Sequence, residues 1–214
     1  MEKKERALTP AEQKRKADFE RLCQQMAQSG YQKRDLTVSV LYANAMSAPV
    51  MLPFAMAAFV AYRVFRPAGS GSFSVSISIP RVVVFWAAIL LLLVLHELIH
   101  GAVWGLFAKE HGRAISFGFI WRLLTPYCTC AEPLAKWQYI AGGAMPTLVL
   151  GIGLTTLAAA LGDLWLLMLA EIMIFGGGGD FLIILKLLRY RHPGKEALFY
   201  DHPYECGVVA FEPM

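Results

Sequence analysis

Charged residues are scarce in this sequence. They make up 17% of its 214 residues, whereas a soluble domain usually carries about 25%. Segments 36–62 and 137–162 contain no Asp, Glu, Lys or Arg, and segments 82–107 and 164–188 contain only a few ionisable residues. Uncharged runs of this length are rare outside membranes. The composition therefore argues against a soluble bundle of buried helices and favours a protein of the lipid bilayer.

Each of these four segments is long enough to cross a bilayer. A hydrocarbon core about 30 Å thick needs about 20 helical residues. We therefore predict four transmembrane helices, over about 38–62, 82–107, 137–161 and 164–188. The predicted fold is an all-α polytopic membrane protein with a short β-strand or hairpin element and an N-terminal amphipathic helix.

The sequence also lacks a secretory signal peptide, because its first 35 residues are polar and charged. Basic residues mark the cytoplasmic side of membrane proteins. They gather in 1–35, in the loop 108–136 and in the tail, which four crossings place on one side. Three arginines fall on the opposite side: Arg63, Arg66 and Arg81. We predict an integral protein of the cell membrane with cytoplasmic termini, divided into a cytoplasmic segment 1–35, a membrane core 36–190 and a cytoplasmic tail 191–214.

Cysteine is scarce as well. The four cysteines are Cys23, Cys128, Cys130 and Cys206. The predicted topology places them on or near the cytoplasmic side, where disulfides are uncommon. We therefore expect four thiols.

Local patterns predict three smaller elements. Residues 9–29 form an amphipathic helix, because Thr9 opens a capping box and Gly30 suits its end. This helix either lies on a membrane or partner surface or packs on the protein's own cytoplasmic face. Segments 72–79 and 114–121 alternate apolar and polar residues, which predicts strands. Whether the two strands pair stays open, because a complete crossing by 82–107 puts them on opposite sides.

The segment His96-Glu97-Leu98-Ile99-His100 carries the chemistry. Residues i and i+4 of a helix project from one face, so His96 and His100 can reach one metal ion. Zinc lowers the pKa of a bound water to about 7, and Glu97 is placed to take its proton. This is the H-E-x-x-H arrangement of metalloproteases. The alternative is a pair of hydrogen-bonded helical histidines, but ionisable side chains are costly to bury in an apolar span.

A catalytic zinc usually has three protein ligands and an open position. The candidates for the third ligand are Asp180, Glu171, His111, His202, Cys128 and Cys130. At about 1.5 Å per residue, His100 lies roughly 10 Å and Asp180 roughly 12 Å from the cytoplasmic ends of their spans, while Glu171 lies deeper.

We therefore predict Asp180 as the third ligand. The glycines 176–179 remove side-chain bulk, so this span can approach the helix of His100 closely or unwind locally. The alternative is a structural aspartate paired with Lys186 or Arg189.

Three further residues are candidates for substrate binding or regulation: His202, Cys128 and Cys130. The two cysteines could bind metal or act in redox control, although a simple turn also explains them. His202 could reach back over the site from the tail, or be an ordinary surface histidine. We assign no catalytic role to Glu171.

The run from His96 to Gly101 resembles an uncharacterised family of membrane zincin peptidases. Further matching motifs bring the resemblance to roughly residues 84–210: Pro126-Tyr127-Cys128, Glu132-Pro133-Leu134, Gly179-Asp180 and Asp201-His202-Pro203. More distantly, the chain is similar to the site-2 protease class of intramembrane metalloproteases. This likeness implies that His96, His100 and Asp180 bind zinc and that Glu97 is the catalytic base.

The chain departs from the site-2 class in two places. Asp180 follows four glycines and precedes Phe181, where that class has an Asn-Pro context and a following glycine. The segment Ala141-Gly142-Gly143 lacks the usual asparagine. These departures concern substrate handling more than metal binding.

The expected function is a zinc-dependent intramembrane or membrane-embedded endopeptidase that hydrolyses peptide bonds of membrane proteins. An extended substrate could pair with the strand 114–121. The expected partners are the lipid bilayer and a membrane protein or peptide substrate, and no nucleic acid. One alternative is a non-catalytic metal-binding scaffold or regulator, against which Glu97 argues. Another is metal transport, which would need more polar residues along the spans than Asn44 and Glu171.

Overall fold

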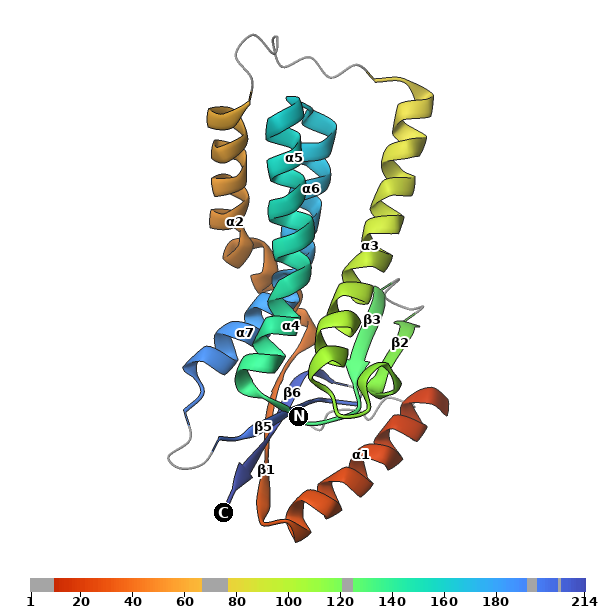
Figure 1. Ribbon diagram of the computed structural model, residues 1–214, viewed down its shortest axis with the longest axis vertical. Coiled ribbons are helices and arrows are strands. Elements are labelled where there is room, and N and C mark those ends of the chain that lie inside the picture. The colour runs from red at the N-terminus through yellow and green to blue at the C-terminus, as the bar shows by residue number, and fades with distance from the viewer. Residues whose placement is uncertain (1–9, 67–76, 121–124, 192–195, 204) are drawn as a thin grey trace.

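The computed structural model describes residues 10–66, 77–120, 125–191, 196–203 and 205–214. It is mostly helical: α1 (Pro10–Gln28), α2 (Val40–Phe65), α3 (Ile79–Phe107), η1 (His111–Ala114), α4 (Lys136–Pro146), η2 (Thr147–Ile152), α5 (Gly153–Leu161), α6 (Leu164–Gly176) and α7 (Gly178–Arg189). The strands are β1 (Tyr31–Val38), β2 (Ile115–Ile120), β3 (Thr125–Cys130), β4 (Leu134–Ala135), β5 (Leu198–Asp201) and β6 (Cys206–Pro213). The strands and α1 lie together at one end of the helical bundle, and we call them the cap (Figure 1).

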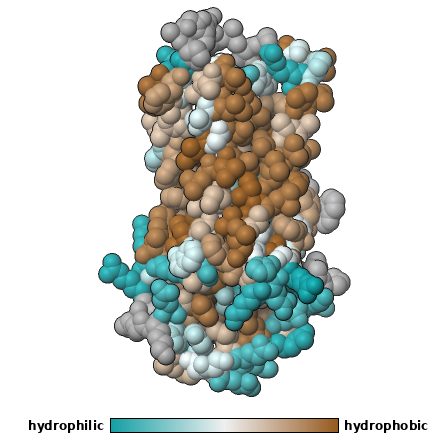
Figure 2. Space-filling view, in the orientation of Figure 1, coloured by the Kyte–Doolittle hydropathy of each residue, from teal (hydrophilic) through white to brown (hydrophobic). Residues whose placement is uncertain are grey.

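The bundle has the dimensions of a membrane domain. Among the residues that the structure describes, three helical stretches are long and apolar enough to cross a bilayer: Leu41–Phe65, Ile79–Phe107 and Lys136–Leu161. The pair α6 and α7 passes the same test as one span bent by 44°, which makes up to four. On the face that Figure 2 shows, apolar side chains cover most of the bundle, while hydrophilic ones gather at the cap and, in smaller number, at the opposite end. Length and composition are thus those expected of an integral membrane protein.

The bend between α6 and α7 occurs at the predicted glycines. A Cβ on Gly177 would lie 2.0 Å from Oγ1 of Thr147 in η2, and one on Gly178 would lie 2.6 Å from Cβ of Ser47 in α2. The predicted local break is present. The neighbours that require these two glycines are α2 and η2, however, and not α3 as the sequence suggested.

The cap contains a four-stranded sheet in the order β1-β6-β5-β4. Strands β1 and β6 are antiparallel, with Tyr31 opposite Pro213 and Val38 opposite Cys206. The prediction of a mostly helical protein with a short β-strand or hairpin element did not include this larger sheet. β1 is an edge strand with mostly exposed polar residues, so its sequence lacks the alternation that would reveal a strand.

A separate hairpin of β2 and β3 lies against α3. Its register pairs Ile115 with Cys130 and Ile120 with Thr125, so the predicted strand at 114–121 is confirmed. Within the described residues its partner is β3. Of the strand predicted at 72–79, residues 72–76 lie outside the described residues. The last residue of that predicted strand, Ile79, is helical instead, because α3 begins there.

The predicted amphipathic helix is present as α1 and is followed by Gly30 with a φ of +82°. Thr9, its predicted cap, lies outside the described residues. Phe19 of α1 is buried against Val209 and Phe211 of β6. The apolar face of α1 thus packs on β6 of the four-stranded sheet, and packing on the protein itself was one of the two predicted arrangements.

The close contact at Gly178 can be tested with a matched pair of variants. Gly178→Ala should lower the unfolding free energy in detergent by about 1–3 kcal/mol, the usual cost of overpacking. In Gly179→Ala the new Cβ meets nothing within 4 Å, so the unfolding free energy should stay the same or rise. Equal unfolding free energies for the two variants would contradict the packing of α7 on α2.

Candidate metal centre

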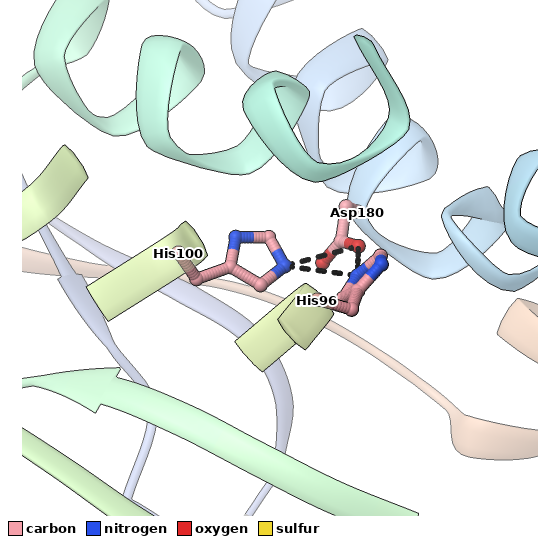
Figure 3. Close-up of side chains that lie close together, drawn as sticks. All are labelled: His96, His100 and Asp180. Carbon is pink, nitrogen blue, oxygen red and sulfur yellow. Dashed lines mark hydrogen bonds and ion pairs between the residues drawn. The ribbon is translucent and has the colours of Figure 1, made fainter. Parts of the chain in front are cut away.

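Two histidines project from one face of α3 toward the interior of the bundle. His96 and His100 are one helical turn apart and both are buried. Their Nε2 atoms lie 3.2 Å from each other (Figure 3). The i, i+4 spacing predicted this convergence, because it returns a side chain to the same face of a helix.

Asp180 completes a trio of donor atoms. It lies in the first turn of α7, where the helix dipole favours a carboxylate. Its Oδ2 lies 3.2 Å from Nε2 of His96 and 3.4 Å from Nε2 of His100 (Figure 3). Within the described part of the chain, these are the only three His, Cys, Asp or Glu residues grouped closely enough to hold a metal ion.

The spacing of these atoms fits a small tetrahedral ion. Zinc binds nitrogen and oxygen at about 2.0–2.1 Å, which places tetrahedral ligand atoms about 3.3–3.4 Å apart. The three observed separations are 3.2, 3.2 and 3.4 Å. The side chain of Asp180 remains 27% exposed, whereas both histidines are buried. Three protein donors are the number that a catalytic zinc site usually has.

A backbone carbonyl orients His100. Its Nδ1–H donates to the carbonyl oxygen of Gly142 in α4, at 2.9 Å. This bond assigns the proton to Nδ1 and leaves the lone pair of Nε2 directed at the trio. Metal-binding histidines commonly have such an outer partner.

Trp104 supports the same imidazole ring. The two rings stack at 4.9 Å with an interplanar angle of 15°. A Cβ on Gly142 would lie 2.0 Å from Nε1 of Trp104, so only glycine lets α4 approach this closely. Sequence reasoning assigned no role to Trp104 or to the Gly142 carbonyl. The sequence did contain a sign of this contact, because Trp104 follows His100 by one helical turn and therefore lies on the same face of α3.

Glu97 lies beside the trio without belonging to it. Its carboxylate is close enough to His96, His100 and Asp180 for their charges to act on it, and it contacts the backbone N–H of Cys128 in β3. The side chain is only partly buried. Glu97 is therefore positioned between the donor atoms and the hairpin.

The two candidate cysteines lie on β3 as buried thiols. Burial raises the pKa of both, that of Cys130 to about 11, so they stay protonated at neutral pH. The backbone of Cys128 is near Glu97, but neither thiol joins the trio. Cys23 and Cys206 are free thiols as well.

The other candidates lie elsewhere. His202 packs against Phe19 with ring centroids 5.7 Å apart, and its Nδ1 accepts the backbone N–H of Glu205. Nδ1 of His111 lies 3.2 Å from the carbonyl oxygen of Gly105. Lys186, the suggested alternative partner of Asp180, donates from Nζ to the carbonyl of Thr37 at 2.9 Å.

Residues 89–193 match the model of a family described as "Putative zincin peptidase". The matched segment is just under half of the chain and contains His96, Glu97, His100 and Asp180. The match supports a metallopeptidase family. A search of curated proteins and a search of solved structures found no match. The more distant likeness to site-2 proteases therefore stays a prediction.

Metal analysis of the purified protein tests the trio. His96→Ala, His100→Ala and Asp180→Ala should each weaken metal binding by more than the roughly 10–100-fold that loss of an outer partner causes. The two donors that remain in each variant hold the ion less tightly than three do. The measurement is metal content after dialysis, followed by competition with a chelator.

Two variants serve as controls for this experiment. His111→Ala and Glu171→Ala remove a histidine and a carboxylate outside the trio, and both should retain the metal. If Asp180→Ala also retained it, Asp180 would not be a ligand.

Proposed function

We propose that the protein is a zinc-dependent, membrane-embedded endopeptidase. Its zinc ligands are His96, His100 and Asp180, and its general base is Glu97. The observation that carries this proposal is the trio of donor atoms at tetrahedral spacing with the carboxylate of Glu97 beside it. The trio lies on the segment that matches a zincin peptidase family, which supports the same chemistry.

Each residue of the site has a distinct role. Zinc, when bound, supplies Lewis-acid chemistry, which polarises a carbonyl group and makes water more acidic. Glu97 accepts the proton of the attacking water and passes it to the leaving amine. The hydrogen bond from His100 to Gly142 places the proton of the neutral imidazole on Nδ1, so that Nε2 carries the lone pair for binding.

The hairpin provides a place for an extended substrate. One edge of β3 pairs with β2, while the backbone of Cys128 on its other edge lies next to Glu97. Backbone hydrogen bonds to a strand edge can hold an unfolded peptide. We therefore propose that the substrate lies along β3, the strand beside Glu97, rather than along 114–121, the strand suggested by the sequence.

The position of the trio favours a membrane protein as the substrate. His96 and His100 lie in a candidate span, in the half of α3 nearer the cap. A peptide bond in or close to a transmembrane segment could therefore reach them, and water could reach them from the cap. The basic residues of 1–35 and of the tail favour placing the cap in the cytoplasm.

Replacing the general base tests peptidase activity. Glu97→Gln keeps the size of the side chain and leaves all three zinc ligands in place, so zinc content should equal that of wild type. Cleavage should fall by about 100- to 10,000-fold, since that is what general-base catalysis contributes. The measurement compares membrane proteomes of cells that express either form, and fragments found only with wild type reveal substrates.

Glu171→Gln is the matched control, because Glu171 is also a carboxylate inside a candidate span but lies outside the trio. This variant should produce the wild-type fragments. Equal fragment patterns from wild type and Glu97→Gln would refute the peptidase and leave a metal-binding scaffold.

A further inference from the structure

We propose that Asp201 is a positioning residue for the metal centre. Its carboxylate holds Tyr139 and strand β3 together, and through them it fixes His100 and Glu97. This inference rests on the proposed role of the trio as a zinc site. Asp201 lies on β5, outside residues 89–193 that match the family.

The first link runs from the ligand His100 to Tyr139. The imidazole of His100 stacks on the indole of Trp104. Nε1–H of Trp104 donates to the carbonyl oxygen of Tyr139 at 3.2 Å, and the two aromatic rings lie 5.3 Å apart. Trp104 is thus held by the first turns of α4, the helix whose Gly142 carbonyl orients His100. Any shift of Tyr139 would move both supports of His100.

The second link joins Tyr139 to Asp201. Tyr139 is only 4% exposed, and its hydroxyl donates to Oδ1 of Asp201. A buried tyrosine hydroxyl needs an acceptor, because an unsatisfied one costs about 1–3 kcal/mol. Asp201 supplies that acceptor from the C-terminal part of the chain.

The third link joins Asp201 to the hairpin. Its other oxygen, Oδ2, accepts the backbone N–H of Cys130 at 3.0 Å. Cys130 is two residues from Cys128, whose backbone contacts Glu97. One carboxylate therefore spans the gap between α4, which supports a zinc ligand, and β3, which lies beside the general base.

A side chain with two acceptor oxygens suits this position better than one with a single acceptor. Burial raises the pKa of the Asp201 carboxyl, and the bonds from Tyr139 and Cys130 oppose that rise. A carboxylate has two acceptor oxygens, so it satisfies both donors. An asparagine has one acceptor oxygen and would lose one of the two bonds.

Metal binding measures this arrangement without relying on peptidase activity. In the full-length protein in detergent, Asp201→Asn and Tyr139→Phe should each weaken zinc binding by up to about 10-fold, because they act on His100 and Glu97 through Trp104 and β3 and a direct outer partner of a ligand contributes about 10- to 100-fold. The visible spectrum of the cobalt(II)-loaded protein should also shift, because it reports the geometry of the ligands. A loss of stability alone would not change that spectrum.

Tyr190→Phe is the matched control. The Tyr190 hydroxyl donates to Oε1 of Glu212 at 2.5 Å, so this variant loses a similar hydroxyl–carboxylate bond elsewhere. Its zinc affinity and cobalt spectrum should match those of wild type.

Wild-type affinity and spectrum in folded Tyr139→Phe and Asp201→Asn would overturn the proposal. If Asp201→Asn fails to fold, Tyr139→Phe decides alone, because it removes a single hydroxyl group. The outcome is independent of cleavage, so it is distinguishable from a failure of the peptidase in the Glu97→Gln experiment.

Discussion

The hydrogen bond between Nδ1 of His100 and the carbonyl of Gly142 is the interaction on which the rest of the site depends. A buried imidazole must satisfy both ring nitrogens. With one nitrogen bonded to α4, the other can face Asp180 and His96. This bond requires α4 to lie directly against α3, and the absence of a side chain on Gly142 makes room for Trp104. The metal centre and the packing of these two helices are therefore one arrangement.

The cap contributes to the candidate site together with the helices. The helices supply the three donor atoms and an apolar surrounding, whereas β3 supplies a backbone edge next to Glu97. The segments before and after the bundle meet in one sheet, where β1 pairs with β6. The two ends of the described chain thus lie on the same side of the bundle as β3, the strand beside Glu97. The proposed peptidase would need such a polar entrance to a site within an apolar bundle.

Features that depend on local sequence were predictable. Long uncharged runs located the apolar helices, and a capping box and Gly30 located α1. The strand β2 showed its alternation. The four-stranded sheet was missed, because its register joins residues as distant as Tyr31 and Pro213. Such pairing leaves no local periodicity. Strands β4 and β5 are short, and β4 pairs with β5 although the two are far apart in the chain, with Leu134 opposite Phe199.

For the metal centre, the sequence by itself determined that His96 and His100 share a face and that Glu97 stands beside them, because helical periodicity dictates the direction of each side chain. It also made Asp180 the best third donor by its depth. Only the tertiary structure decided that the Oδ2 atom of Asp180 meets both histidines, that Gly142 and Trp104 orient His100, and that Asp201 joins Tyr139 to β3. These contacts connect segments far apart in the chain, so they depend on how whole helices and strands pack and not on any local pattern.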